Sequence, residues 1–146
     1  MIEDFTEDHL RARVTEEEAE RLRGEAISLA ITDASNPDRI WGGASLFDLD
    51  WTNHRAGIGY WLTAYARHQG AATRSVRLLA HWAFTNLTVM RLELTCAPEN
   101  LASQQVAARC GFTREGLLRS HIPFQGRRHT VLFSLLPTDL RHPSPD

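Results

Sequence analysis

The residues best placed to do chemistry in this sequence lie in two short motifs, each at the predicted start of a helix. The first is a small-residue turn between a predicted strand and a predicted helix, Arg67-His68-Gln69-Gly70-Ala71-Ala72-Thr73. The first turn of a helix offers free N–H groups and the positive end of a dipole, and Gly70 and Ala72 let a ligand approach that backbone closely. Such a turn suits a pyrophosphate, with charge added by Arg67 and Arg74. Taken alone, it is equally compatible with a tight turn that needs small residues only for packing.

The second motif follows the next predicted strand and pairs an asparagine with a serine. It reads Ala97-Pro98-Glu99-Asn100-Leu101-Ala102-Ser103 and is followed by Cys110-Gly111-Phe112. Asn100 stands where a helix begins, so it is either a simple N-cap or a ligand-binding residue. Ser103 is then either a first-turn residue that faces water or a hydroxyl available for catalysis. No G-x-S-x-G motif surrounds it, which argues against a hydrolase nucleophile.

Composition excludes several other kinds of function. The chain has 146 residues, with 16 Lys and Arg against 18 Asp and Glu, and its net charge of −2 argues against a broad nucleic-acid-binding face. Its 7 histidines are dispersed and its 2 cysteines, Cys96 and Cys110, belong to no ligand cluster, so no metal site is expected. No apolar run is long enough to span a membrane, and the acidic N-terminus lacks a secretion signal. We therefore expect one cytoplasmic domain with reduced thiols and no membrane partner.

Hydrophobic periodicity predicts three helical regions that would position these motifs. Segment 7–23 reads as one helix or two, with Thr6 as a cap and Gly24 as the stop. Residues 70–86 form the strongest helix and residues 101–110 a short one. Leu78, Trp82 and Phe84 widen the apolar stripe of the strongest helix, so we expect much of this helix to be covered by other elements. Core or pocket-wall positions are expected for the four tryptophans, Trp41, Trp51, Trp61 and Trp82.

Alternation and turn residues predict strands around these helices. The first three, over residues 26–31, 40–50 and 57–62, have short links and suggest an antiparallel meander, with Asn36-Pro37-Asp38 as the first turn. A fourth strand covers residues 91–96, and two more lie between 112 and 136 around the turn Gln125-Gly126. This order of elements indicates an α+β domain with a mixed sheet.

In this order, the two motifs and their elements resemble the GNAT (GCN5-related) N-acetyltransferase superfamily, and within it the RimJ/RimL-like branch. The segments that carry the resemblance are Gly59-Tyr60-Trp61-Leu62, 73–79, Asn100 with Ser103, 110–116 and 135–140. The resemblance implies the GNAT fold, a mixed and mostly antiparallel sheet with splayed central strands and flanking helices. It implies a single domain over residues 1–140 with a short tail at 141–146. The usual first strand and first helix of the family have no counterpart before Thr6, so we expect an open acceptor side or a homodimer that completes it.

The resemblance also implies that acetyl-CoA is the co-substrate, with no metal. In this family it lies where the strands at 57–63 and 91–97 splay apart, with its pyrophosphate on the backbone of 68–73. N–H groups near 61–63 would hold the pantetheine arm and the thioester carbonyl. The implied cofactor-binding residues are Trp61, Leu62, Thr63, Arg67, His68, Gln69, Gly70, Ala71, Ala72, Thr73, Asn100 and Ser103.

The sequence departs from the family pattern at both expected catalytic positions. The tyrosine that many members carry in the helix after the asparagine is replaced by Ala107, so Ser103 becomes the candidate acid for the departing thiolate. The usual glutamate of the fourth family strand is replaced by Gly57, and Glu93 on the next strand is the substitute. A salt-bridged or solvated strand residue is the alternative for Glu93. Proton relays are possible at His54, His121 and His129, which are otherwise surface or loop histidines.

These features together predict an N-acetyltransferase that moves an acetyl group from acetyl-CoA to a primary amine by direct attack. The favoured acceptor is the N-terminal amine of a protein or peptide, and a small-molecule amine is the alternative. A non-catalytic acyl-CoA-binding module, or a purely structural domain with a degenerate loop, stays open because the usual tyrosine and glutamate are missing.

Overall fold

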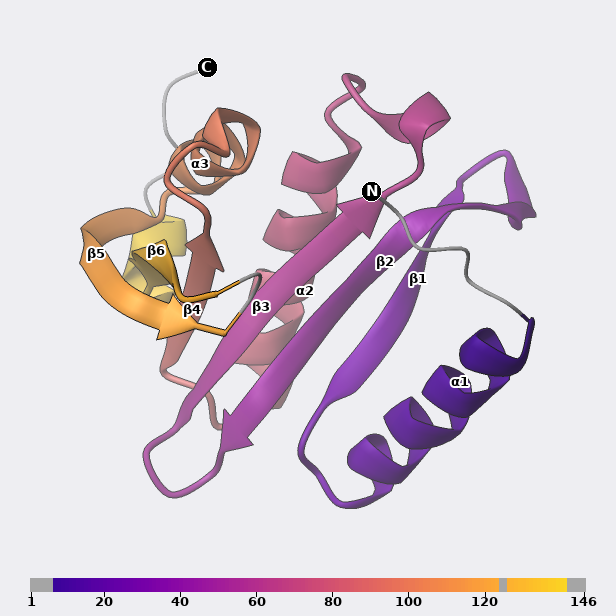
Figure 1. Ribbon diagram of the computed structural model, residues 1–146, viewed down its shortest axis with the longest axis horizontal. Helices are drawn as coiled ribbons and strands as arrows, with labels where there is room; N and C mark the ends of the chain where they lie inside the picture. The colour runs from indigo at the N-terminus through magenta and orange to yellow at the C-terminus, as the bar shows by residue number, and fades with distance from the viewer. Residues whose placement is uncertain (1–6, 124–125, 142–146) are drawn as a thin grey trace.

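The structure is a computed structural model that describes the backbone of residues 7–123 and 126–141 and the side chains of residues 15–123 and 126–140. Its helices and strands follow the predicted order (Figure 1). In chain order they are α1 (Glu7–Leu22), β1 (Ile27–Asp33), β2 (Asn36–Asp50), β3 (Arg55–Leu62), the short 3-10 helix η1 (Ala64–Ala66), α2 (Ala71–Asn86), β4 (Arg91–Cys96), α3 (Leu101–Arg109), β5 (Thr113–Ile122), β6 (Arg128–Leu135) and η2 (Pro137–Arg141).

All the described strands form one mixed sheet in the order β1-β2-β3-β4-β6-β5. The first three form the predicted antiparallel meander, and β6 pairs antiparallel with β4 on one side and with β5 on the other. Within the described sheet, β3 and β4 are the parallel neighbours. Since α2 connects β3 to β4, this pair is the crossover unit expected of parallel strands, and the predicted mixed α+β class is confirmed.

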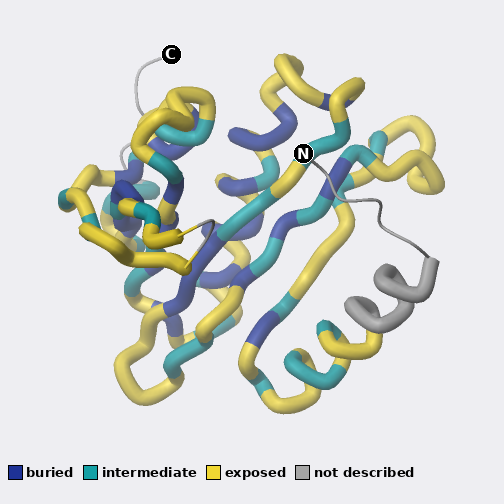
Figure 2. Tube along the Cα trace, viewed as in Figure 1, coloured by how far each residue is buried: buried dark blue, intermediate teal, exposed yellow. Residues whose placement is uncertain are grey.

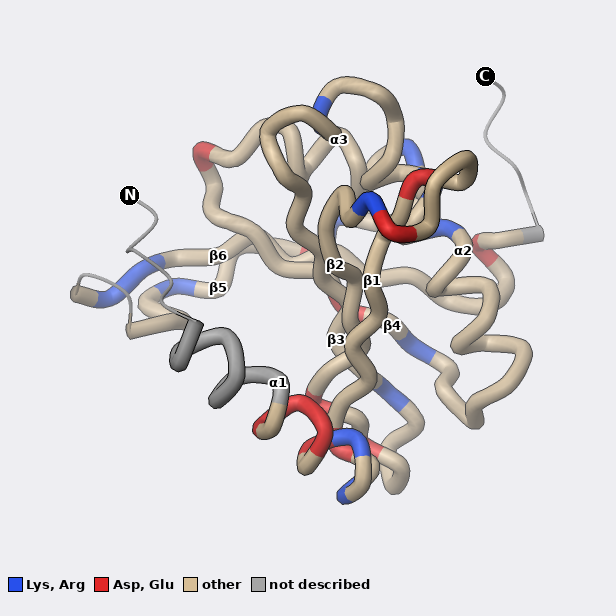
Figure 3. The backbone as a smooth tube through the Cα atoms, turned by 90° about the vertical axis from the view of Figure 1, so that its right-hand side faces the viewer, with Lys and Arg blue, Asp and Glu red and all other residues tan. Residues whose placement is uncertain are grey.

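The core lies between the sheet and α2, and Figure 2 shows the buried residues following that contact. Strand residues Ala44, Leu46, Ala56 and Ile58 alternate toward the helix. The buried residues of α2 that belong to the same core are spaced by three or four: Val76, Leu79, Ala80 and Ala83. Figure 3 shows α1 and α2 on opposite sides of the sheet, with the β5–β6 hairpin reaching out on the side of α1. The face of β2 and β3 away from α2 therefore has no helix packed along it in the described chain.

The first hairpin turn lies earlier than the sequence predicts. Asn36 already pairs with Asp33, so the turn is formed by Ala34 and Ser35. The Asp33 carboxylate stabilises it by accepting hydrogen bonds from the Ser35 N–H and hydroxyl, at 2.9 and 2.7 Å. Pro37 lies in the register shift that follows, where a residue without an N–H is tolerated.

The first helix is continuous, which decides between the one-helix and two-helix interpretations. Gly24 ends it as predicted, with a left-handed φ of 71°. The predicted cap, Thr6, lies outside the described residues.

The prediction that three apolar residues widen the covered face of α2 holds for Phe84 alone. Phe84 is partly buried and packs against the core, whereas Leu78 is 72% and Trp82 41% exposed, because they lie on the side of the helix that faces away from the sheet. Trp51 and Trp61 are also exposed rather than core residues, and Trp41 is partly buried. None of the described helices is long and apolar enough to cross a membrane.

Candidate active site

The parallel strands β3 and β4 pair along only part of their length. The register couples Arg55 with Arg91, Ala56 with Leu92 and Gly57 with Glu93, and there the pairing stops. Beyond those pairs β3 continues to Leu62 and β4 to Cys96, and Figure 1 shows the two strands diverging. The predicted splay of the central strands is therefore present.

Two helices begin just past the diverging ends. α2 follows β3 through a short loop, and α3 follows β4 after four residues, Ala97-Pro98-Glu99-Asn100. Because the two strands are parallel, both helix N-termini lie at the same edge of the sheet, with their free N–H groups and positive dipole ends. This edge is where open sheets of parallel strands usually bind ligands.

The loop before α2 presents backbone donors without backbone partners. In the described chain, the Arg67 N–H bonds to the Ala64 carbonyl and the Arg74 N–H to the Gly70 carbonyl, but the N–H groups from His68 to Thr73 make no backbone hydrogen bond. His68 and Gly70 both have left-handed φ angles, 62° and 75°. Alternating left-handed and right-handed residues turn successive N–H groups toward one side, a geometry that binds anions.

The polar side chains of this loop are used to hold its shape. Arg67 donates to the Leu62 carbonyl at 3.3 Å, and Arg74 to the Gln69 carbonyl at 2.9 Å. Gln69 donates in turn to the Tyr65 carbonyl at 2.8 Å. Both arginines are exposed, so the loop combines directed N–H groups with two positive charges. The buried first turn of α2, Ala71, Ala72 and Thr73, packs behind it.

The end of β3 offers fewer donors than the sequence suggests. The Thr63 N–H donates to the Trp41 carbonyl at 2.8 Å and is no longer available. Along an antiparallel strand, backbone N–H groups point alternately toward and away from the neighbouring strand. The N–H of Trp61, which lies opposite Gly43, is therefore also directed toward β2. By the same alternation the Leu62 N–H is directed away from β2, toward the divergence.

On the α3 side, Ser103 lies at the centre of a small polar cluster. Asn100 caps the helix by accepting the Ser103 N–H at 3.1 Å, so the N-cap interpretation of Asn100 is correct. The Ser103 hydroxyl does not simply face water, because Tyr60 on β3 donates to it at 3.3 Å. Burial raises the pKa of the Cys96 thiol, and a hydrogen bond from Ser103 works against that shift. The cluster thus joins β3, β4 and α3.

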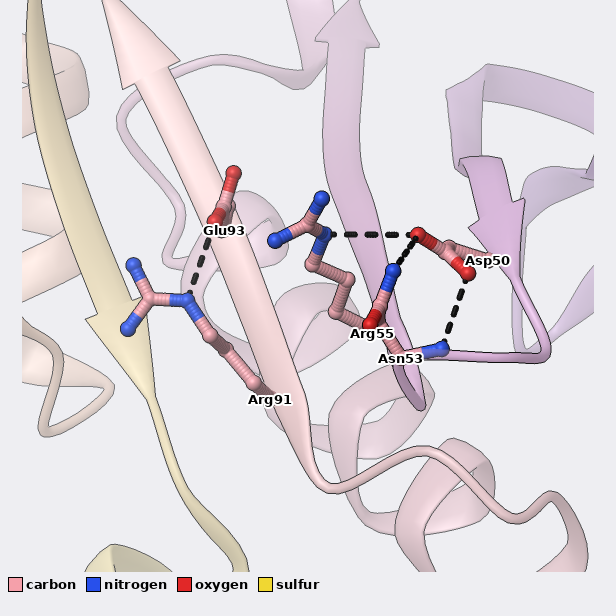
Figure 4. Close-up of polar contacts among 5 residues, drawn as sticks. All are labelled: Asp50, Asn53, Arg55, Arg91 and Glu93. Atoms are coloured by element: carbon pink, nitrogen blue, oxygen red, sulfur yellow. Dashed lines mark hydrogen bonds and ion pairs between the residues drawn. The ribbon is translucent and has the colours of Figure 1, made fainter.

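Glu93 lies on the other face of the sheet and is ion-paired. Its carboxylate accepts from Arg91 Nε at 2.9 Å, and the same guanidinium bonds Glu115 at 2.7 Å (Figure 4 shows the first contact). No hydrogen bond joins Glu93 to Ser103 within the described residues. The register nevertheless makes Glu93 the direct cross-strand neighbour of Gly57, the position where the usual glutamate is missing. The salt-bridged interpretation of Glu93 is therefore correct, and its carboxylate lies where the pairing of β3 and β4 ends.

Two aromatic rings cover glycines on this same face. A Cβ atom at Gly57 would lie 2.3 Å from the Phe47 ring, and one at Gly43 would lie 2.5 Å from Trp61 Nε1. Only glycine lets the rings lie so close to the strands. Trp61 is 59% exposed, so its side chain faces away from the core while its backbone belongs to the diverging strand. The result is an apolar surface beside Glu93.

The remaining candidates lie apart from this cluster. His54 is exposed in the β2–β3 turn, and His121 and His129 are exposed on the β5–β6 hairpin. There the His121 ring bonds the Thr130 hydroxyl at 2.8 Å, and the His129 ring accepts the Ser120 N–H at 2.7 Å. Both cysteines are free and buried. No group of three potential metal ligands occurs among the described residues.

Sequence reasoning missed Tyr60 as a functional residue. It belongs to the segment that carries the family resemblance, but no role was assigned to it. The available signal was its alternation with Ile58 and Leu62 on the α2 face, because a phenol at the end of a buried face needs a hydrogen-bond partner. The identity of that partner, 43 positions away, was not visible in the spacing.

Comparison with known proteins identifies this arrangement. The family model for the acetyltransferase (GNAT) domain matches residues 2–113. The chain therefore belongs to the GNAT acetyltransferase family, and the resemblance to its RimJ/RimL-like branch is confirmed by the relatives below.

Among curated proteins, the chain is 34% identical over 138 residues to "Probable N-acetyltransferase YjcK" of Bacillus subtilis (strain 168), spanning 92% of this chain and 76% of that protein. Among solved structures, it resembles RimJ of Mycobacterium smegmatis in complex with CoA-disulfide, with a TM-score of 0.83, 25% identity and coverage of 92% of this chain and 64% of that one. It also resembles RimL, a ribosomal L7/L12 alpha-N-protein acetyltransferase in complex with coenzyme A, with a TM-score of 0.79, 26% identity and coverage of 90% and 73%.

Proposed function

We propose that this chain transfers an acetyl group from acetyl-CoA to a primary amine, with the N-terminal amine of a protein or peptide as the favoured acceptor. The observation that carries the proposal is the divergence of β3 and β4, with two helix N-termini just beyond it and the Ser103 hydroxyl in the first turn of α3, bonded to Tyr60 of β3. A long, thin, anionic ligand suits this arrangement, because the strand edges offer backbone hydrogen bonds and the helix ends offer a phosphate site.

The residues fit acetyl-CoA in two places. The N–H groups of His68 to Thr73 are unbonded to other backbone and lie between two arginines, which suits the pyrophosphate. The Leu62 N–H is directed toward the divergence, which suits the pantetheine arm or the thioester carbonyl. Asn100 contributes by fixing the first turn of α3. CoA in the solved RimJ and RimL structures supports this assignment of the co-substrate.

In the proposed reaction the acceptor amine attacks the thioester carbonyl directly, without an acyl-enzyme. Ser103 is the candidate acid for the departing thiolate, since its hydroxyl lies in the first turn of α3 and accepts a hydrogen bond from Tyr60 on the diverging strand β3. Glu93 is the candidate base, acting through water from the opposite face. Its carboxylate is ion-paired with Arg91 beside the end of the β3–β4 pairing, where it would attract an incoming ammonium.

The acceptor is proposed from the relatives. The solved RimL neighbour is named as a ribosomal L7/L12 alpha-N-protein acetyltransferase. In the described chain no helix packs along β2 and β3 on the face away from α2, and this face is proposed for a polypeptide end rather than for a small molecule. Phe47 and Trp61 would contact the first side chains of such a peptide.

The test is release of CoA from acetyl-CoA in the presence of a panel of peptides with free N-termini, the same peptides with blocked N-termini, and small amines. We expect turnover that requires a free peptide α-amine. Turnover on small amines alone would favour the small-molecule alternative. Acetyl-CoA at about 100 times its Kd should stabilise the fold by about 2.7 kcal/mol. That stabilisation without turnover would favour a non-catalytic acyl-CoA-binding module. Absence of the stabilisation would contradict both the acetyltransferase and the binding module.

A Ser103→Ala variant tests the proposed acid. We expect kcat to fall about 10-fold to 100-fold while the KM for acetyl-CoA changes little, because the lost bond matters mainly when the thiolate leaves. Ser28→Ala, on an exposed position of β1, is the matched serine control. An unchanged kcat in Ser103→Ala would return Ser103 to a purely structural role.

A further inference from the structure

A side-chain hydrogen bond spans the divergence of β3 and β4. The Tyr60 hydroxyl, near the end of β3, donates to the Ser103 hydroxyl on α3 at 3.3 Å. Tyr60 is partly buried, on the α2 face of its strand with Ile58 and Leu62. The bond therefore links β3 to α3, the helix that follows β4, at a point where the backbones of β3 and β4 no longer pair.

This bond limits how the Ser103 proton can be directed. A hydroxyl has one proton and two lone pairs, and Tyr60 fills one lone pair as the donor. The Ser103 proton must then point away from Tyr60, where it can meet another acceptor. The Ser103 main chain is itself held by the Asn100 cap. The position of the Ser103 oxygen is thus fixed by two neighbours, and the bond from Tyr60 restricts where its proton can point.

The phenol also stays protonated at neutral pH. Burial raises the pKa of Tyr60 above its ordinary value, while the bond to Ser103 works in the opposite direction. A protonated phenol retains the proton that it donates to Ser103, so the bond persists across the pH range in which an amine acceptor would react.

Resting on the proposed function, we propose that Tyr60 is a positioning residue that directs the Ser103 proton toward the sulfur of the departing CoA. In the step concerned, the amine nitrogen bonds to the thioester carbonyl carbon and the C–S bond breaks, leaving its electron pair on sulfur. The sulfur takes the proton of Ser103, the amine gives one proton to water, and water returns one proton to Ser103. The products are an acetamide and CoA thiol, with no oxidation or reduction.

The proposal explains how this chain can work without the tyrosine that many family members carry in the helix. Ala107 occupies that position and is buried in the core. A phenolic hydroxyl nevertheless reaches Ser103, but from β3. Because it acts through Ser103, its effect should disappear when Ser103 is removed.

A double-mutant cycle tests this coupling. We expect Tyr60→Phe to lower kcat about 5-fold to 10-fold with little change in the KM for acetyl-CoA, the size expected of one buried hydrogen bond. Combined with Ser103→Ala, it should cause almost no further loss. Tyr65→Phe removes the only other tyrosine hydroxyl of the chain, which bonds the Ile40 carbonyl, and should leave kcat within about twofold. Equal losses from Tyr60→Phe with and without Ser103, or a change in KM alone, would overturn the proposal.

A titration tests the bond without any turnover. In Tyr65→Phe, Tyr60 is the single remaining tyrosine, so its ionisation can be followed by tyrosinate absorbance after a rapid pH jump. Adding Ser103→Ala should raise the Tyr60 pKa, because the group that stabilises its ionised form is lost. An unchanged pKa would overturn the proposal even if the enzyme is active. A wild-type chain that binds acetyl-CoA but acetylates no amine would contradict both the proposed function and the positioning role of Tyr60. In an active enzyme, additive effects of Tyr60→Phe and Ser103→Ala on kcat would contradict the positioning role alone.

Discussion

The two faces of the sheet are built on different principles. On the α2 face, the groups proposed to hold acetyl-CoA are backbone N–H groups and short hydroxyls, supported by a packed core beneath them. On the opposite face, proposed for the acceptor, the groups are long side chains, with Glu93 and Glu115 sharing one arginine and two aromatic rings lying on glycines. Backbone donors are fixed by the fold, whereas exposed side chains can change identity without disturbing the core. The contrast suggests one constant cofactor side and one adjustable acceptor side.

The largest expected effect tests the backbone loop. Gly70→Glu should weaken acetyl-CoA binding more than about 100-fold, because it strains a left-handed residue and places a negative charge beside the proposed pyrophosphate site. Isothermal titration measures the loss. Gly126→Glu is the matched control, since Gly126 also has a left-handed φ, 94°, and open space around its Cα. Equal binding by both variants and the wild type would break the comparison at its cofactor side.

The second effect tests how firmly the core supports that loop. Cys110 donates to the Thr73 carbonyl at 3.5 Å, and burial raises the pKa of its thiol to about 11 from an ordinary value of 9.0. An unfolded thiol ionises near pH 9 while the folded one stays protonated, so stability is full below pH 9 and is lost as pH rises toward 11.

We therefore expect the free energy of unfolding to fall by about 2 kcal/mol between pH 8 and pH 10.5 from this thiol. Urea unfolding at both pH values measures the fall, and Cys110→Ala should show a smaller one. The same pH dependence in both proteins would mean that Cys110 is not the group responsible.

A smaller effect tests Glu93 on the acceptor face. Glu93→Gln should lower kcat about 10-fold if the carboxylate accepts the amine proton, because an amide cannot take up that proton. Glu115→Gln provides a matched control, because Glu115 bonds the same Arg91 guanidinium but does not neighbour Gly57. Similar losses in the two variants would assign the effect to Arg91 rather than to proton transfer.

The smallest expected effect concerns the aromatic surface. Trp61→Ala should raise the acceptor KM about threefold to tenfold and change the acetyl-CoA KM less, because we propose that the exposed ring contacts the acceptor, and the substitution leaves the backbone in place. Trp82→Ala, on the exposed side of α2, should change neither KM. A rise confined to the acetyl-CoA KM would place the Trp61 ring on the cofactor side and contradict the comparison.

The sequence predicted best those features that depend on a few neighbouring residues. The cap at Asn100, the helix stop at Gly24 and the start of α2 after Gly70 are all local, and each lies where its residue type predicts. The predicted position of the first turn was wrong. Asn36-Pro37-Asp38 is a strong turn signal, but the Asp33 carboxylate stabilises an earlier turn. Local signals compete, and the structure reports which hydrogen bonds form.

Features that depend on distant residues were not predictable in the same way. The apolar stripe of α2 includes Leu78 and Trp82, but periodicity alone does not tell how many elements pack around a helix. The bond from Tyr60 to Ser103 requires the register of β3 against β4, which the chain encodes only through its overall packing. The resemblance to the family supplied the splayed strands, but the roles of individual side chains within it had to come from the structure.

The short parallel pairing of β3 with β4 also has a consequence for how the chain folds. The strands on each side of this pairing are continuous in sequence: β1 to β3 form an antiparallel meander, and β4 to β6 form the rest of the sheet. Local pairings form faster than distant ones, and the N-terminal part leaves the ribosome first. We expect the meander to assemble before β4 has been synthesised, with α2 then recruiting the second half onto it. The parallel pairing of β3 with β4 would form last, so folding would end at the place where these two strands diverge.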